Sequence, residues 1–304
     1  MSENTSITSS NCTSLLGGTK LLRSSETVTI PTPKQNNARG TSMDVGSTLS
    51  NPDADPETEH VRVTYKLDNY GLSDFLSVAS NFNANEYGFV ATPNVDGLIR
   101  LKESASFRAA YAKAAYVLLD SRVASFLFRL FRNVRIPVCP GSDLTDALFT
   151  RVIRPDDHIV LVGSTEPQAQ MLRERFGLKH LIHYNPPMGF IRDPEAVEAT
   201  LQFVESASPF RFCLVAVGDP QGVYLAHRLG ERQKARGLAF IIGASIDFMT
   251  GKQRRAPTWM QRIGFEWFFR LLSDPRRLAR RYLVRGPKFF AYLGTTRVLL
   301  RQAE

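Results

Sequence analysis

The chain has few cysteines and no long apolar run. Its 304 residues include three cysteines, Cys12, Cys139 and Cys213, which are odd in number and far apart. This pattern favours a reducing compartment and argues against a disulfide framework. No stretch approaches the ~20 uninterrupted apolar residues of a membrane-spanning helix. The N-terminus has no basic segment leading into an apolar one, so we expect no secretory signal.

Metal-ligand clusters and dinucleotide fingerprints are also missing. The five histidines show no metal-ligand spacing, because His180 and His183 lie three apart in an apparent strand and point to opposite faces. The chain contains neither a G-x-G-x-x-G motif nor a Walker phosphate loop. We therefore predict that the protein uses no metal and no cofactor. A nucleotide-dependent oxidoreductase is an alternative that the sequence supports only weakly.

Aromatic residues are absent before Tyr65. Residues 1–58 contain 10 Ser, 10 Thr and 5 Asn. Such a segment buries too little apolar surface to offset the entropy lost on ordering, so we predict a disordered leader over residues 1–58.

From His60 onward, short β-branched apolar runs alternate with helical stretches. Candidate strands cover 61–65, 87–92, 115–120, 135–139, 158–163, 180–184, 210–218 and 238–245, and candidate helices cover 96–113, 122–132, 143–152, 166–176, 194–206 and 222–236. This alternation predicts an α/β core over residues 59–251, with one Rossmann-like, mostly parallel sheet and helices on both faces. Ligands of such sheets bind beyond the carboxyl ends of the strands.

Three of these strand ends carry polar groups of interest. Asp120 ends an apolar strand, where it would serve either as a general base or as the N-cap of the next helix, and spacing alone favours the cap. Thr92 and Asn94 would bind a sugar or phosphate, or form a capped turn. Gly141 and Ser142 lead into a helix N-terminus, a natural anion site, although the loop is not specific.

The positive charge lies in the last sixth of the chain. Residues 252–304 contain 13 Lys and Arg against three Asp and Glu, a net charge of +10, whereas the rest of the chain has a net charge of −1. Aromatic residues are interleaved with these arginines, as in an interfacial helix on an anionic membrane. We predict a basic amphipathic appendage over residues 252–304 that contacts an anionic membrane surface, and no nucleic-acid partner.

Two helices are expected in this appendage. Trp259, Ile263, Trp267 and Leu271 follow one helical stripe, with Glu266 and Arg270 forming a charge pair on the opposite face. A second helix begins after Asp274 with Pro275 at its first position. It places four arginines on one side, namely Arg276, Arg277, Arg280 and Arg281.

Residues 243–283 carry a family resemblance. They contain Arg255-Ala256-Pro257-x-Trp259, Glu266-Trp267-x-x-Arg270-Leu271 and Pro275-x-Arg277-x-x-Arg280-Arg281-Tyr282. These elements resemble the hallmark of the WecG/TagA/CpsF glycosyltransferases, glycosyltransferase family 26. Upstream, Thr92-Pro93-Asn94, Asp120 and Gly141-Ser142-Asp143-Leu144 are similar to further motifs of that family.

The resemblance implies a bacterial inverting, metal-independent glycosyltransferase of surface polysaccharide synthesis. Its donor would be a UDP-sugar, of the N-acetylmannosamine or uronic-acid type or glucose, and its acceptor a polyprenyl-diphosphate-linked glycan on the cytoplasmic membrane face. Asp120 would be the general base, Thr92, Asn94, Gly141 and Ser142 would bind substrate, and Asp247 would lie near the nucleotide. The lipid diphosphate would be bound by arginines, namely Arg254, Arg255, Arg276, Arg277, Arg280 and Arg281.

Two family positions differ in this chain. Asp120 is followed by Ser121 where Gly is common, and Pro220-Gln221-Gly222-Val223 stands where the family commonly has P-x-Q-E. The missing Gln-Glu pair favours an alternative function, a non-catalytic homologue that binds lipid-linked glycan. The oligomeric state stays open, and a homo-oligomer is one of the alternatives.

Overall fold

The computed structural model describes residues 63–302, apart from the side chain of Arg277. These residues all fall within one compact unit, Leu49–Glu304. The predicted leader over residues 1–58 lies outside the described residues, and so does Cys12.

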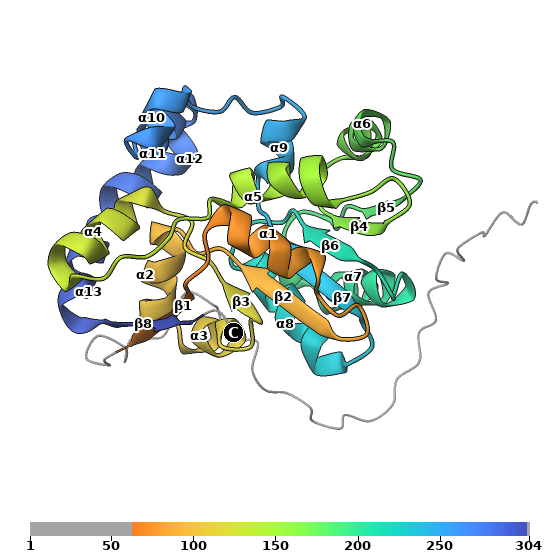
Figure 1. The fold of residues 1–304 in the computed structure, drawn as a ribbon, viewed down its shortest axis with the longest axis horizontal. Coiled ribbons are helices and arrows are strands. Elements are labelled where there is room, and N and C mark those ends of the chain that lie inside the picture. Colours follow the sequence, from red (N-terminus) through yellow and green to blue (C-terminus); the bar gives the residue numbers. More distant parts are fainter. Residues whose placement is uncertain (1–62, 303–304) are drawn as a thin grey trace, which may run out of the picture. The chain divides into compact units, whose positions relative to one another are not determined.

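A six-stranded parallel sheet forms the centre of this unit (Figure 1). Its strands lie in the order β3-β2-β7-β6-β4-β5, and each neighbouring pair is parallel. They are β2 (Tyr87–Ala91), β3 (Tyr116–Val117), β4 (His158–Val162), β5 (His180–Tyr184), β6 (Phe212–Val215) and β7 (Gly237–Ile241). The predicted parallel sheet is confirmed.

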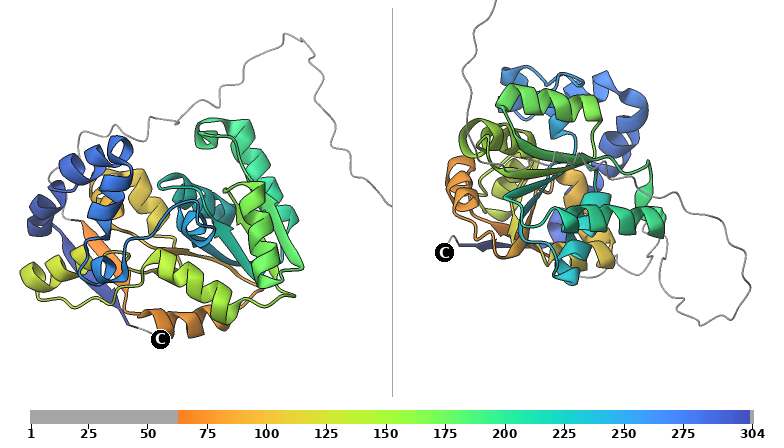
Figure 2. Two further views of the ribbon diagram at one scale, coloured as in Figure 1. Left: turned by 90° about the horizontal axis from the view of Figure 1, so that it is seen from above. Right: turned by 90° about the vertical axis from the view of Figure 1, so that its right-hand side faces the viewer.

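Consecutive residues of the central strands face opposite sides of the sheet. In β4, Val160 and Val162 belong to one apolar core, whereas Ile159 and Leu161 belong to the other. Both cores are covered by helices, which is why the strands read as continuous apolar runs. Figure 2 shows helices on both sides of the sheet, as predicted.

The helices divide between the two faces. One core includes residues of α2 (Val95–Glu103), α3 (Ala105–Tyr111), α4 (Arg122–Arg132), α7 (Pro194–Ser206), α8 (Gln221–Arg232) and α13 (Lys288–Thr295). The other includes residues of α1 (Leu72–Ser80), α5 (Gly141–Ala147), the π-turn η1 (Leu148–Val152), α6 (Glu166–Phe176) and α9 (Ser245–Met249). The remaining helical segments are η2 (Phe190–Arg192), α10 (Thr258–Arg262), α11 (Glu266–Ser273), α12 (Pro275–Ala279) and the π-turn η3 (Arg280–Arg285).

The C-terminal segment returns to the start of the described chain. Strand β8 (Arg297–Arg301) pairs in parallel with β1 (Thr64–Asp68) in a second, two-stranded sheet. Arg301 forms an ion pair of 2.6 Å with Asp68, whose carboxylate also accepts a 2.6 Å hydrogen bond from the backbone N–H of Val117. This carboxylate therefore links the C-terminal strand to the central sheet.

The predicted apolar stripe of the appendage is not continuous. Gly264 adopts a φ of +80° between α10 and α11, a conformation that favours glycine and ends a helix. Leu271 is consequently buried, whereas Trp259 and Ile263 are 61% and 60% exposed. The i, i+4 ion pair of Glu266 and Arg270 is confirmed at 3.3 Å.

Other local predictions differ from the structure. Residues 133–140 form no helix or strand, although their apolar run predicts a strand at 135–139. The predicted helix over 96–113 is divided at Ser104, whose side chain caps α3. Pro275 begins α12 as predicted, but the following turn is a π-helix, so the spacing of a regular helix fails at Arg280.

Candidate active site

Asp120 lies at the carboxyl edge of the sheet. Its backbone N–H donates to Pro93 O over 2.9 Å, which fixes the segment after β3 beside the loop after β2. Burial raises the pKa of the Asp120 carboxyl to about 7, and the charge of Arg270 and a hydrogen bond from the Gly141 backbone N–H partly oppose that rise. A carboxyl that is half protonated near neutral pH is suited to exchanging protons with a substrate.

The capping role belongs to a neighbouring residue. Ser121 is the N-cap of α4, and its Oγ accepts a 3.1 Å hydrogen bond from the backbone N–H of Ala124. The interpretation of Asp120 as the helix cap is therefore wrong, because the next residue takes that position. The Asp120 carboxylate stays available for a different role.

Thr92 and Gly141 lie next to Asp120. A Cβ placed on Gly141 would lie 3.1 Å from Thr92 Oγ1 and 3.6 Å from Asp120 Oδ2. The structure therefore brings together three residues that are separated in the sequence but were all expected at the site. Glycine at position 141 allows the chain to pass this close to Thr92 Oγ1.

Asn94 is the N-cap of α2. Its Oδ1 accepts hydrogen bonds from the backbone N–H groups of Asp96 and Gly97, at 3.0 and 3.2 Å. The same oxygen accepts a 3.0 Å hydrogen bond from Arg281. Asn94 therefore joins the loop after β2 to the C-terminal segment, and its oxygen is already engaged in holding that junction.

The C-terminal segment contributes directly to the electrostatics of Asp120. Arg270, on α11, lowers the pKa of the Asp120 carboxyl, and its ion-pair partner Glu266 raises it. Arg270 is itself held over the Phe248 ring, with its guanidinium carbon 4.7 Å from the ring centroid. The appendage therefore brings charged side chains close enough to Asp120 to act on its carboxyl.

The appendage also contacts the loop that carries the substrate-binding candidate Ser142. Arg255 donates to Ser142 Oγ over 3.0 Å and forms an ion pair with Asp143, both in the first turn of α5. The arginine predicted to bind a lipid diphosphate thus neutralises an acidic side chain of the core. It positions the loop that carries Gly141.

Asp247 lies elsewhere along the same edge of the sheet. Its Oδ1 accepts a 2.8 Å hydrogen bond from Gln168 and lies 3.3 Å from Lys252 Nζ. The amide of Gln168 also donates to Thr250 over 2.9 Å. Asp247 therefore links α6 to α9 and is not placed against Asp120 by any of these contacts.

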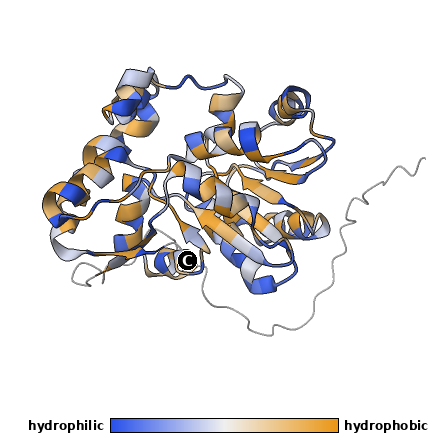
Figure 3. Ribbon diagram, in the orientation of Figure 1, coloured by the Kyte–Doolittle hydropathy of each residue, from blue (hydrophilic) through white to orange (hydrophobic). Residues whose placement is uncertain are grey.

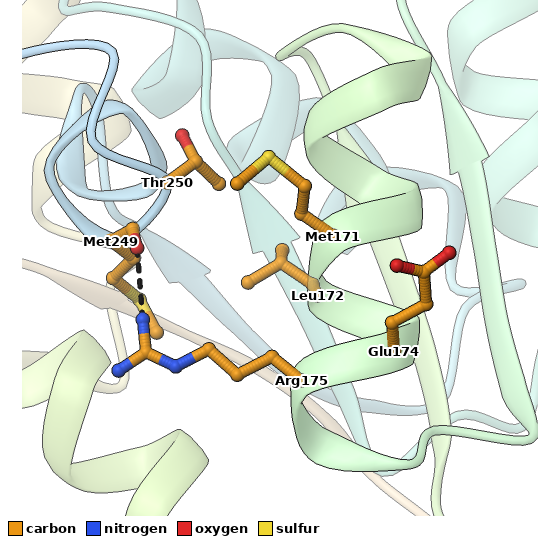
Figure 4. A pocket seen from close by; sticks show the side chains of 6 residues that line it. All are labelled: Met171, Leu172, Glu174, Arg175, Met249 and Thr250. Carbon is orange, nitrogen blue, oxygen red and sulfur yellow. Dashed lines mark hydrogen bonds between the residues drawn. The ribbon is translucent and has the colours of Figure 1, made fainter.

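An open pocket lies between α6 and α9 (Figure 4). Its lining residues are Met171, Leu172, Glu174, Arg175, Met249 and Thr250. Arg175 donates a 2.9 Å hydrogen bond to the backbone oxygen of Met249 across it. No residue proposed from the sequence lines this pocket, so it is separate from the Asp120 cluster.

A second carboxyl group, that of Asp219, lies in the loop between β6 and α8. Burial raises the pKa of Asp219 to about 6, and the charges of Arg281 and Arg100 partly oppose that rise. The pKa of the buried Tyr111 hydroxyl is raised by burial and by the negative charges of both Asp219 and Asp120. The charges of both carboxyls therefore act on the same phenol.

The remaining arginines differ in their surroundings. Arg281 lies 3.7 Å from Asp96, and Arg285 forms ion pairs with Asp96 and Glu103 at 3.3 and 2.9 Å. The side chains of Arg254, Arg276 and Arg280 are exposed, whereas that of Arg277 lies outside the described residues. The predicted four-arginine face is thus divided between a core contact and the surface.

Sequence reasoning missed three charged residues of the site. Arg270 and Glu266 were predicted only as a charge pair on the helix face opposite the apolar stripe, although both belong to the quoted E-W-x-x-R-L motif. Asp219 directly follows an expected strand end, but its loop has no specific pattern. For Arg270 and Glu266, the usable signal was their place in the family motif. For Asp219, the signal was a charged residue directly after a predicted strand.

Between residues 63 and 302, no group of three or more His, Cys, Asp or Glu side chains is arranged to hold a metal ion. No helix in the same range is both long and apolar enough to cross a bilayer.

The model of a known family covers all of the described residues. The model of the glycosyl transferase WecG/TagA/CpsF family matches residues 62–303, which include both sheets, the Asp120 cluster and the arginine-rich segment. Enzymes of this family are glycosyltransferases of polysaccharide synthesis. This chain therefore belongs to the WecG/TagA/CpsF family of glycosyl transferases.

Proposed function

We propose that the protein transfers a sugar, with inversion, from a UDP-sugar to a polyprenyl-diphosphate-linked acceptor without a metal ion. The observation that carries the proposal is the Asp120 carboxyl, whose pKa is raised by burial to about 7 and which lies against Gly141 and Thr92. In an inverting transfer, one carboxylate removes the proton of the acceptor hydroxyl as that oxygen attacks the anomeric carbon. The bond to UDP breaks on the opposite face.

The charge of the departing UDP needs stabilisation. Arg270 supports this role, because its charge already acts on the Asp120 carboxyl and its guanidinium is fixed above Phe248. A preorganised cation favours the transition state without reorganisation during the reaction. Thr92, Ser142 and the amide of Asn94 are the proposed contacts to the donor sugar, with Asp247 nearer the nucleotide.

The acceptor diphosphate is negatively charged, so its binding requires solvent-accessible cationic side chains. Arg254, Arg276 and Arg280 are exposed and lie on the same C-terminal segment as Arg270, whose charge acts on Asp120. We assign the lipid diphosphate to these arginines and to Arg277, whereas Arg255 and Arg281 position core loops through Asp143 and Asn94. A peripheral location on the inner face of the cell membrane follows, because the acceptor lipid is anchored there.

The test is a transfer assay with a panel of UDP-sugars and a short-chain, water-soluble polyprenyl-diphosphate acceptor. We expect turnover with one donor class, and kcat/KM that rises with pH through about 7 and then levels, because the base must be ionised. A rate independent of pH between 5 and 9 would contradict the role of Asp120.

The absence of the Gln-Glu pair after Pro220 favours a second candidate, a homologue that binds lipid-linked glycan without turnover. Donor binding is measured as protection against thermal unfolding and is compared with the result of the transfer assay. Together, the two measurements distinguish a transferase from a homologue that only binds. Protection without transfer by any donor of the panel would support the binding function.

A further inference from the structure

Helix α4 has two apolar faces, and only one of them is covered by the protein. Ala124, Leu127 and Phe128 are buried, and the Phe128 ring lies 5.6 Å from that of Phe289 in an edge-on contact. Phe126 and Leu130 are nevertheless 62% and 60% exposed. Large apolar side chains at adjacent exposed positions mark an interaction surface more often than a solvated one.

The exposed face of α4 combines these apolar residues with arginine. Arg122, Phe126, Arg129 and Leu130 follow the i, i+4, i+7, i+8 spacing of one helical face, and all four are exposed. Phe131, 58% exposed, adds a further ring at the end of the helix. A face of this composition is typical of a helix that lies in the interface of a bilayer.

The charge around α4 has a single sign. Between Asp120 and Asp143 the chain contains four arginines and no lysine or acidic residue. One of the four, Arg132, holds the helix to the C-terminal segment by donating to the backbone oxygens of Leu293 and Thr296. This positive surface complements an anionic partner, and its exposed apolar residues favour a partner that has an apolar interior. An anionic lipid bilayer has both properties.

The exposed apolar surface continues onto the C-terminal segment. The turn at Gly264 lies against the start of α4, since a Cβ at that position would be 3.6 Å from Val123 and 3.7 Å from Arg122. On either side of this glycine, Ile263 and Phe265 are 60% and 48% exposed. Figure 3 shows apolar and charged residues alternating along α4.

We propose that α4 is a second membrane-contact element, whose exposed face lies in the surface of an anionic bilayer beside the C-terminal segment. The inference rests on the membrane association proposed above and adds a contact from within the α/β core. Since Ser121 caps α4 immediately after Asp120, an 11-residue helix held at the bilayer fixes the position of the base relative to the membrane. Such a helix is about 16 Å long. The docked helix would thereby present the base to an acceptor whose diphosphate lies at the lipid headgroups.

The first experiment compares full-length variants with exposed positions changed. Phe126→Ser/Leu130→Ser/Phe131→Ser removes the apolar residues of the α4 face, and Met188→Ser, which alters a fully exposed methionine in the loop after β5, is the matched control. Partition is measured by co-sedimentation with vesicles of phosphatidylglycerol and phosphatidylcholine. We expect the triple variant to lose about tenfold or more in partition coefficient, and the control to lose little.

The second experiment reports on insertion itself. In a Cys12→Ser background, Leu130→Cys and Met188→Cys each carry an environment-sensitive fluorophore, since Cys139 and Cys213 are buried. We expect a blue shift on anionic vesicles at position 130 alone. An unshifted probe at position 130, or unchanged partition of the triple variant, would overturn the proposal.

Two further readouts separate this inference from its alternatives. The triple variant should turn over the short-chain, water-soluble acceptor at the rate of the wild type. If neither protein transfers sugar to this acceptor, the result contradicts the proposed function and does not bear on the role of α4. If a second copy of the chain covers α4, the triple substitution will change the sedimentation coefficient and leave vesicle binding unchanged, which would also overturn membrane docking. Melting temperatures verify that each variant is folded.

Discussion

Arg281 Nη2 donates a 3.0 Å hydrogen bond to Oδ1 of Asn94, the residue that caps α2. The contact joins a C-terminal arginine of the basic segment to the loop that follows β2. It also distinguishes Arg281 from the exposed Arg276 and Arg280, which share its motif.

Because their surroundings differ, substitution of Arg281 should have a different effect from substitution of Arg276 and Arg280. Arg281→Gln removes the bond to Asn94 and should lower stability by about 1 kcal/mol, or roughly 2–4 °C in melting temperature. The matched double variant Arg276→Gln/Arg280→Gln should keep the melting temperature and lose roughly tenfold in binding to anionic vesicles. Calorimetry and co-sedimentation on the same samples check both outcomes, and equal melting losses would contradict the distinction.

Substitutions of Asp120 and Ser121 should affect different properties, catalysis for Asp120 and helix capping for Ser121. Asp120→Asn keeps the size of the side chain but removes the base, so kcat should fall on the order of 10²–10⁴-fold. Ser121→Ala removes the bond to the Ala124 N–H and should cost about 1 kcal/mol of stability with most of kcat retained. Near-full activity of Asp120→Asn in the transfer assay would exclude it as the base.

The two carboxyls of raised pKa predict a pH dependence of stability. The pKa values of Asp120 and Asp219 are raised by burial to about 7 and about 6, so between pH 4 and 7 the folded state binds more protons than the unfolded state. Their contribution to the free energy of unfolding therefore falls as pH rises through this window. Asp120→Asn should stabilise the protein by about 1–3 kcal/mol at pH 8 and by little at pH 4. Denaturant titrations at the two pH values measure this, and an equal effect at both would be inconsistent with the raised pKa.

Gly141 should be intolerant of a side chain. In Gly141→Ala, the new Cβ would lie only 3.1 Å from Thr92 Oγ1, so either the loop or the Thr92 side chain beside Asp120 must shift. Because small displacements of a catalytic group are costly, we expect kcat to fall by roughly 10- to 100-fold. Gly294→Ala is the control, since no atom lies within 4 Å of the Cβ it would add. Steady-state kinetics compare the two, and equal rates would show that the site adapts.

Glu103 should hold the C-terminal segment through a group of contacts. Lys288 Nζ and Arg285 Nη2 each lie 2.9 Å from its carboxylate, and the Tyr292 hydroxyl donates over 3.1 Å. Burial opposes ionisation, but the hydrogen bond from Lys288 and the charge of Arg285 outweigh it and lower the pKa of Glu103. The stabilisation is therefore present above the unfolded pKa and lost as pH falls through the lower folded value.

Glu103→Gln should accordingly destabilise the protein at pH 7 by about 1–2 kcal/mol and have a smaller effect at pH 3. Glu174→Gln, which alters another carboxylate at a helix surface, is a suitable control. Thermal unfolding at both pH values checks the expectation. A loss for Glu103→Gln that does not shrink at pH 3 would contradict an ionic origin.

The sequence by itself determined the fold class and the position of the proposed base at the edge of the sheet. Continuous apolar strands separated by helices allow a parallel sheet covered on both faces, because each strand must bury both of its sides. A carboxylate directly after such a strand necessarily lies at the sheet edge where ligands bind, so Asp120 was found without coordinates. Thr92 and Gly141 followed from the same rule.

Only the tertiary structure decided which charges meet at that edge. Local spacing placed Arg270 on the helix face opposite the apolar stripe and favoured a capping role for Asp120, because helical periodicity describes neighbours within one element and is silent about other elements. Folding places α11 against the site, gives the cap to Ser121 and pairs the C-terminal strand β8 with β1. These contacts join residues far apart in the chain, and they depend on how whole elements pack, which no local pattern encodes.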